Sequence, residues 1–267
     1  HGRDRRQRQM CIRDRRRLAK VMHKSEKELA YLDDLDGTAL QRLRQALQAS
    51  LLDRFADLFE RMAAGGKIAP DALSALLCKK VFGPTLTANM SYYTPTDKSV
   101  KMSKHFSDDF LTEIAREQIP ERAQEQLEKL PVDLMRPVTR NLLAMKDYSS
   151  MGGFMDYMPE DKIITLMEEV KDPADHLRVS SFAQRKDRVA RIATTLDDET
   201  IKRQIEVAYS DADFIMEVGL VASEMDAANQ QRMARLTDEV NPDYREKSRE
   251  MARQAGLEDQ LQAFFAA

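Results

Sequence analysis

The clearest pattern in the sequence is a stripe of large apolar residues between positions 40 and 62. They recur every three or four residues, and Leu52 and Phe59 widen the stripe. This spacing is that of one face of an amphipathic helix packed on a globular body. The pattern predicts one long helix that begins after residues 36–38 and ends at Gly65-Gly66, because glycine readily adopts the conformation of a helix C-cap.

A second helix is predicted from about Pro70 to Phe82, with Gly83-Pro84 ending it. Its apolar positions follow the helical period and are expected to point inward; they are Leu73, Leu76, Leu77 and Val81. Residues 84–106 lack such a period, because Thr, Ser, Asn, Tyr and Pro interrupt it. We expect this segment to be a loop with one or two short helices.

Short helices are predicted to continue from Ser107 onward, with breaks that recur. An apolar residue precedes a helix-starting pair at four places, which are Ile119-Pro120-Glu121, Met158-Pro159-Glu160, Leu196-Asp197-Asp198 and Met225-Asp226-Ala227. Proline in the first turn and acids near the N-terminus both favour a helix start. The spacings of 39, 38 and 29 residues are typical of a solenoid-like or superhelical array. The alternative is that all-helical proteins without repeats also show loose recurrences of this kind.

Composition supports the same fold class. The 267 residues include only 9 Gly and 9 Pro, fewer than a β-sandwich or a doubly wound fold needs for its turns. We predict an all-α protein, with a long helix and a helical pair in 22–106 packed as one body with a superhelix over 107–256. The tail, 257–267, is amphipathic. We expect it to fold back on this body rather than dock on a partner or a membrane surface.

The N-terminal segment 1–21 is strongly basic, with eight Arg and one Lys against two Asp, a net charge of +7. Such an arm could hold nucleic acid or an acidic membrane. Two features favour a non-native or disordered segment instead. The chain begins with His1, and the run MCIRDR at 10–15 resembles a translated sequencing adapter, so Met22 is the expected native start. The remaining 33 basic and 43 acidic residues give a net charge of −10, which predicts no nucleic-acid partner for 22–267.

Motifs for catalysis, cofactors or metals are absent from the sequence, so no catalytic residue, cofactor or metal ligand is assigned. No second His and no Cys stands at metal-site spacing from any of the four histidines, which are His1, His23, His105 and His176. Gly152-Gly153 lacks the flanking residues of a phosphate-binding loop and is expected to break a helix. Of the two cysteines, Cys11 lies in the basic arm, and Cys78 is expected to be buried and inert. His105 is expected to be structural or at the surface.

Acidic groups occur at 108–109, 160–161 and 197–199. They could pair as general acid and base or bind a divalent cation. All three lie at predicted helix starts, however, where the helix dipole already explains them. No apolar run is long enough to span a membrane and no signal peptide is evident, so a cytoplasmic location is predicted.

The irregular segment 84–106 holds the one cluster that combines aromatic and basic side chains. Its members are Tyr92, Tyr93, Lys98 and Lys101. Because loops on rigid scaffolds often carry function, these residues are the candidates for contact with a partner.

One stretch resembles a known family. The run Ile119-Pro120-Glu121, followed by Ala123, Leu127 and Leu130-Pro131-Val132-Asp133, is similar to the short-helix repeats of the cytoplasmic N-terminal domain of MgtE magnesium transporters. The FliG flagellar-rotor family has a similar superhelix. The resemblance covers about 107–240 and implies a helical superhelix with a regulatory or docking role. The transporter's CBS domains and membrane span are not evident in the sequence.

Two functions from different classes follow. The first is a non-catalytic cytoplasmic scaffold or regulatory module that binds a protein partner, with a link to magnesium implied by the resemblance. The second is an enzyme whose site forms across 84–106 and the acidic helix starts without a local motif. A deep pocket lined by His105, Tyr92 and several acids would favour the enzyme.

Overall fold

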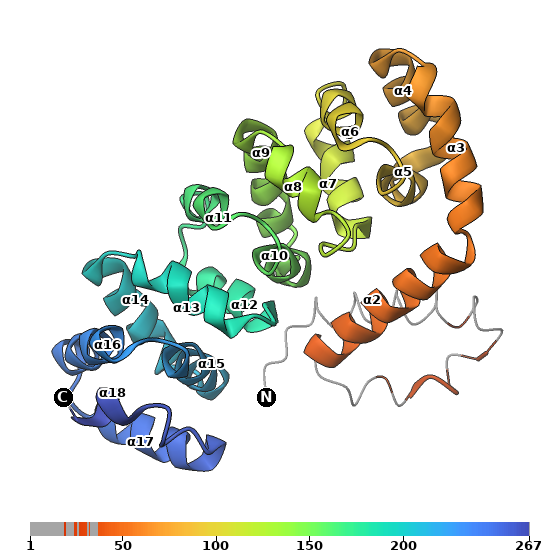
Figure 1. Cartoon of the computed structure of the whole chain (residues 1–267). Coiled ribbons are helices and arrows are strands. Elements are labelled where there is room, and N and C mark those ends of the chain that lie inside the picture. The colour runs from red at the N-terminus through yellow and green to blue at the C-terminus, as the bar shows by residue number, and fades with distance from the viewer. Residues whose placement is uncertain (1–18, 20–23, 26, 31, 33–36, 267) are drawn as a thin grey trace. The chain divides into compact units, whose positions relative to one another are not determined.

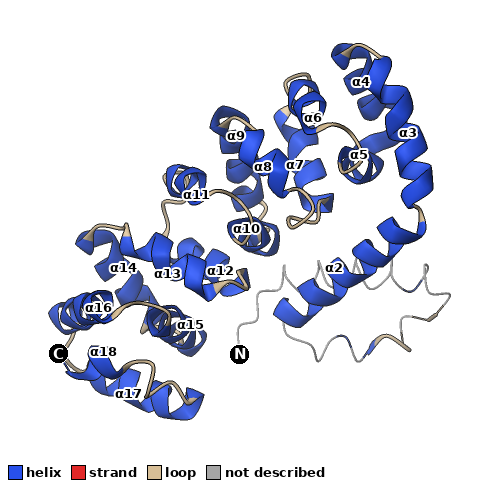
Figure 2. Ribbon diagram, viewed as in Figure 1, coloured by secondary structure: helices blue, strands red, loops and turns tan. Residues whose placement is uncertain are grey.

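A computed structural model of the chain describes residues 19, 24, 25, 27–30, 32 and 37–266. The predictions for most of the basic arm, for Met22, for Cys11 and for His23 lie outside the described residues. In the described part of the chain the elements are helices and turns with no strand (Figure 2), so the predicted all-α fold class is confirmed. None of the described helices is both long enough and apolar enough to cross a membrane.

Helices make up most of the described chain (Figure 1). In chain order they are α2 (Gly37–Arg54), α3 (Ala56–Ile68), α4 (Asp71–Leu77), the π-helical turn η2 (Cys78–Phe82), α5 (Gly83–Ser91), α6 (Thr96–Ser103), α7 (Asp108–Glu117), α8 (Gln124–Lys129), α9 (Val132–Ala144), α10 (Tyr148–Met155), α11 (Glu160–Met167), α12 (Pro173–Phe182), α13 (Lys186–Thr194), α14 (Asp198–Ala208), α15 (Ala212–Ser223), α16 (Ala227–Val240), α17 (Tyr244–Ala255) and α18 (Gln262–Ala266).

The chain divides into two compact units, His1–Leu51 and Leu52–Ala267. In the first unit, Ala19, Leu29 and Leu32 are buried together, and Leu43 packs against them. In the second unit, α5 packs directly on α7, so helices on both sides of position 106 belong to the same unit.

The prediction of one long helix that ends at Gly65-Gly66 is wrong in two respects. The helix is interrupted at Phe55, whose backbone (φ −112°, ψ 17°) separates α2 from α3. It also continues through Gly65-Gly66 to Ile68. The chain leaves the helix at Ala69, which is extended (ψ 147°), because the residue before a proline, here Pro70, is sterically disfavoured in the helical region.

The segment 84–106 is more regular than predicted. Helices α5 and α6 fill most of it, so the two expected short helices are present and the loop between them is short. Gly83, with a left-handed φ of 71°, ends η2 as expected, and Pro84 then stands in the first turn of α5. Proline suits that position because it needs no amide partner there.

The second unit is built by helices that pack on the helix two positions further along the chain. One row runs from α3 through α5, α7, α9, α11, α13 and α15 to α17, and α10, α12, α14, α16 and α18 form another. Buried apolar clusters fill the space between them. Leu261 and Phe264 of the C-terminal tail lie in one cluster, at 2% and 6% exposure, so the tail does fold back on the body.

Three of the four predicted helix starts are confirmed. Helix α11 begins after Pro159, and Asp197 and Asp226 cap α14 and α16 by accepting backbone hydrogen bonds. At 119–121 a turn comes first and α8 begins only at Gln124. The prediction that Gly152-Gly153 breaks a helix is wrong, because both residues lie inside α10.

Candidate functional site

An exposed apolar surface of the second unit lies on α4 and η2. Four large apolar side chains, here called the leucine stripe, are exposed by 49%, 48%, 41% and 66%; they are Leu73, Leu76, Leu77 and Val81. The prediction that these residues point inward is therefore wrong. The same helical run buries small side chains instead, namely Ser74, Ala75 and Cys78.

The orientation follows from how this helical run packs. Helix α4 packs on α6, and η2 packs on α5. Small side chains on the inner face allow neighbouring backbones to approach closely, whereas leucines there would hold them apart. The hydrophobic period alone does not distinguish the two faces, because one bears large apolar residues and the other bears small residues that are also easily buried.

Two lysines lie on the same helical run as the leucine stripe. Lys79 and Lys80 are exposed within η2. The whole segment 66–106 contains six Lys and two Asp, a net charge of +4, whereas 107–267 contains 21 basic and 33 acidic residues, a net charge of −12. The stripe is thus an apolar surface in the basic part of an otherwise acidic unit.

The four predicted contact residues are not gathered in one exposed patch. The Tyr92 hydroxyl accepts a hydrogen bond from the Ile119 N–H at 2.6 Å, and burial raises the pKa of Tyr92 to about 12. The Tyr93 ring stacks on Phe59, with ring centroids 6.1 Å apart. These two side chains therefore have structural roles.

Of the two lysines, Lys98 is mostly buried, and its Nζ donates to the Ala69 carbonyl at 2.6 Å and to Asp71 at 3.1 Å. Lys101 is exposed. Nothing in the structure tests contact of these residues with a partner, which stays a prediction.

A large cavity of about 390 Å³ lies within the second unit, lined by residues from α3 to α12. Among its described lining residues there is no Asp, Glu or His, and neither Tyr92 nor His105 reaches it. The pocket that would have favoured an enzyme therefore does not form around the predicted residues. The cavity wall is instead mostly apolar.

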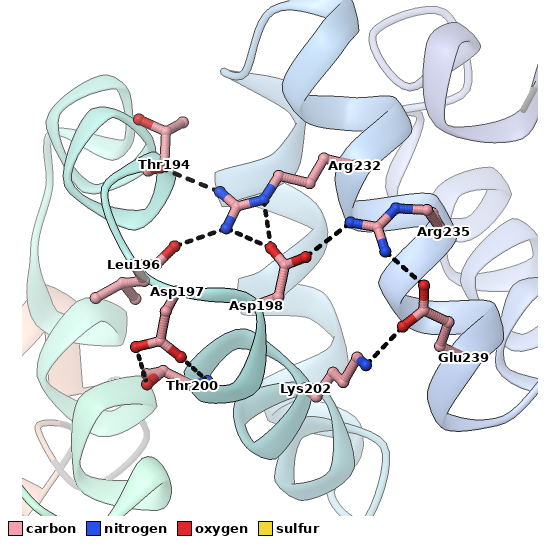
Figure 3. A network of polar contacts seen from close by, with 9 residues as sticks. All are labelled: Thr194, Leu196, Asp197, Asp198, Thr200, Lys202, Arg232, Arg235 and Glu239. Carbon is pink, nitrogen blue, oxygen red and sulfur yellow. Dashed lines mark hydrogen bonds and ion pairs between the residues drawn. The ribbon is translucent and has the colours of Figure 1, made fainter.

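The acidic group 197–199 takes part in a network that joins helices (Figure 3). Asp197 accepts from the Thr200 N–H at 2.8 Å at the start of α14. Asp198 binds both Arg232 and Arg235 of α16, at 2.6 and 2.8 Å. Arg232 also donates to the carbonyls of Thr194 and Leu196, so this network ties the end of α13 and the start of α14 to α16.

The other titratable candidates also have structural surroundings. Glu160 pairs with Arg191, and Ser107 rather than an acid caps α7. Cys78 is buried, which raises the pKa of its thiol, so the prediction of a buried thiol is confirmed. Within the described part of the chain no three His, Cys, Asp or Glu side chains gather in a way that could hold a metal ion.

Comparison with known proteins identifies no matching family model, no matching curated protein and no matching solved structure. The resemblance to the MgtE N-terminal domain therefore stays a prediction. The features that sequence reasoning missed are the outward orientation of the leucine stripe and the cavity. The sequence of 73–81 shows an amphipathic pattern with lysines beside the apolar face. It does not show whether that face points to the core or to the solvent.

Proposed function

We propose that this protein is a non-catalytic binding module that docks an amphipathic, acidic helix of a partner protein on the leucine stripe. The observation that supports it is the exposure of four large apolar residues on one helical face. Contiguous apolar surface of this kind on a folded protein commonly marks an interaction site. A partner helix would bury its own apolar face against the stripe.

Charge supports the choice of partner. Exposed Lys79 and Lys80 lie on the same helical run as the stripe, and the surrounding segment carries a net charge of +4. Acidic residues flanking the apolar face of the partner would be attracted to these lysines, which favours orientation and encounter more than affinity. A regulatory role and a link to magnesium are parts of the proposal that rest on the resemblance at 119–133.

The test compares two variants in affinity capture from the source cells, with and without millimolar magnesium. Leu73→Gln with Leu76→Gln removes half of the stripe, and neither residue contributes to the cavity wall. Ile164→Gln on α11 is the control, because Ile164 is also a large apolar side chain, exposed by 39%, but lies outside the stripe. All three substitutions are at exposed positions, where effects on stability are commonly within about 0.5 kcal/mol.

The proposal expects a partner that the unmodified chain and Ile164→Gln capture, with recovery reduced about ten-fold or more in the stripe variant, equivalent to about 1.4 kcal/mol. Equal recovery by the stripe variant would contradict it. Binding to anionic vesicles that the stripe variant loses, with no protein partner, would contradict it in favour of a membrane surface. Recovery that changes with magnesium would support the regulatory form of the proposal.

A further inference from the structure

The cavity in the second unit is large enough and long enough for an elongated ligand. Its volume of about 390 Å³ is more than twice the roughly 150 Å³ of an engineered apolar cavity that binds benzene. Four successive members of one helix row contribute to its wall, namely α5, α7, α9 and α11. Because packed helices lie about 8–10 Å apart, the cavity extends over about 25 Å.

The two ends of the cavity differ in character. Toward α10 and α12 the wall consists of buried apolar side chains, including Leu142, Met151, Phe154, Val170 and Val179. Toward α4 and α6, here called the polar end, serine, threonine and Lys98 side chains line the wall beside apolar ones. The cavity reaches the surface there, because Gly65 and Leu77 line it and are exposed. Lys98 is the one charged residue among the described lining residues.

Two hydroxyl groups at the polar end have no hydrogen-bond partner. Seven serine and threonine residues line the cavity. Five of them donate to a carbonyl three or four positions back in the chain; they are Thr87, Ser91, Thr94, Ser103 and Thr139. Among the described residues, the remaining two, Ser74 on α4 and Ser99 on α6, have buried hydroxyl oxygens without a partner.

This difference points to a ligand. A serine inside a helix ordinarily satisfies its hydroxyl on its own backbone, as the five neighbours do. Ser74 is only 6% exposed, and a buried polar group without a partner requires an explanation. Two free donors on adjacent packed helices, beside a lysine, suit an acceptor group that carries negative charge.

We propose that the cavity binds one long-chain fatty acid, with its carboxylate accepting hydrogen bonds from Ser74 and Ser99 and its alkyl chain extending toward α12. The net charge of +4 over 66–106 favours an anionic head at this end, where the Lys98 ammonium, paired with Asp71 at 3.1 Å, also lies at the cavity wall. The hydrocarbon core of a bilayer, two acyl chains thick, measures about 30 Å, so a cavity of about 25 Å accommodates a single chain. The two proposals are tested separately, because Leu73 and Leu76, the residues changed in the stripe variant, do not line the cavity, although Leu77 of the stripe does.

Calorimetric titration of the full, delipidated chain with hexadecanoic acid tests the proposal. We expect one site per chain and binding that weakens about ten-fold or more in Ser74→Ala and in Ser99→Ala, as loss of a hydrogen bond to a charged group predicts. Ser103→Ala is the matched control, because its hydroxyl lines the same cavity but donates to the Ser99 carbonyl. It should bind as tightly as the unmodified chain. Hexadecanol should bind at least ten-fold more weakly than the acid.

Three results would overturn the proposal. One is the absence of saturable binding of hexadecanoic acid to the unmodified chain. The second is unchanged affinity in both Ser74→Ala and Ser99→Ala. The third is equal affinity for hexadecanol, which would mean that the cavity does not recognise a carboxylate. Ser74→Ala and Ser99→Ala remove hydroxyls that have no partner in the fold. Circular dichroism of each variant checks that it is folded, so that lost affinity is distinguished from unfolding.

Discussion

At the scale of single residues, two helical glycines have opposite surroundings. A Cβ atom placed on Gly152 of α10 would lie 2.7 Å from the Phe182 Cβ and 2.7 Å from the Val179 carbonyl oxygen of α12. A Cβ atom on Gly65 of α3 would meet nothing within 4 Å. Gly152 thus permits the close approach of α10 and α12, whereas Gly65 has no such role.

Gly152→Ala is accordingly expected to lower the free energy of unfolding by about 1–3 kcal/mol, because the helices must separate to admit the methyl group. Gly65→Ala should raise it by up to about 1 kcal/mol, since alanine loses less backbone entropy in a helix. Urea unfolding followed by circular dichroism measures both. If Gly152→Ala leaves the free energy of unfolding unchanged, α10 and α12 are not packed this closely.

Tyr92 provides a second test at this scale. Its hydroxyl accepts a hydrogen bond from the buried Ile119 N–H at 2.6 Å, and no other acceptor for that amide is seen in the described residues. Tyr92→Phe leaves the amide unsatisfied, which should cost about 1–3 kcal/mol of stability by urea unfolding. A loss below about 0.5 kcal/mol would show that the amide finds another partner.

The same residue predicts a pH dependence. Burial raises the pKa of Tyr92 from its ordinary value of 10.0 to about 12. A raised pKa in the folded state means that the contribution of Tyr92 to stability is complete below pH 10 and declines as the pH rises toward 12. Phenolate absorbance, taken as the difference between the unmodified chain and Tyr92→Phe, should show this ionisation near pH 12; ionisation near pH 10 would contradict burial.

At the scale of helices, the sequence predicted where most elements lie better than which way they face. The caps at Asp197 and Asp226 and the proline at 159 are local signals, since each acts on the helix that follows directly. The orientation of the run formed by α4 and η2 depends instead on the contacts of α4 with α6 and of η2 with α5, which a hydrophobic period does not encode. The cavity was beyond prediction for the same reason, because its wall comes from helices between α3 and α12.

Between helices, the ion pair of Lys186 and Glu217 joins α13 to α15. The Lys186 Nζ lies 2.8 and 2.9 Å from the two Glu217 carboxylate oxygens, and the side chains are 19% and 7% exposed. Lys186→Met should lower the free energy of unfolding by about 3–5 kcal/mol, because it leaves a buried carboxylate unpaired. Adding Glu217→Leu should recover most of that loss.

An exposed pair provides the control for this cycle. Arg253 and Glu258 are 3.4 Å apart with side chains 53% and 56% exposed, so Arg253→Ala should cost less than about 1 kcal/mol. Urea unfolding measures the stability of the unmodified chain, Lys186→Met, the double variant and Arg253→Ala. A double variant as unstable as Lys186→Met alone would show that the loss comes from the lysine stem rather than from the unpaired charge.

At the scale of the whole second unit, the main helix–helix contacts in the described chain join helices no more than three positions apart. Most polar contacts between helices obey the same rule, since partners are 31 residues apart in Arg116–Asp147, 28 in Gln184–Asp156 and 34 in Arg232–Asp198. The pair Arg122–Asp53, 69 residues apart, is an exception. Stability in such an array is approximately a sum of local terms and interfaces between neighbours. A substitution at one end of the unit should therefore lower the stability mainly of the helices beside it.

Phe264→Ala makes that expectation measurable. Phe264 is 6% exposed in the apolar cluster formed by α14 to α18, and truncating it should remove about 3–5 kcal/mol of local stability. We expect hydrogen exchange to accelerate in α14–α18 while α5–α9 keep their protection, because no direct contact carries the loss across the array. Uniform acceleration from α5 to α18 would instead mean that the unit unfolds as one cooperative body, in which case the stripe and the cavity would share the stability of the C-terminal helices.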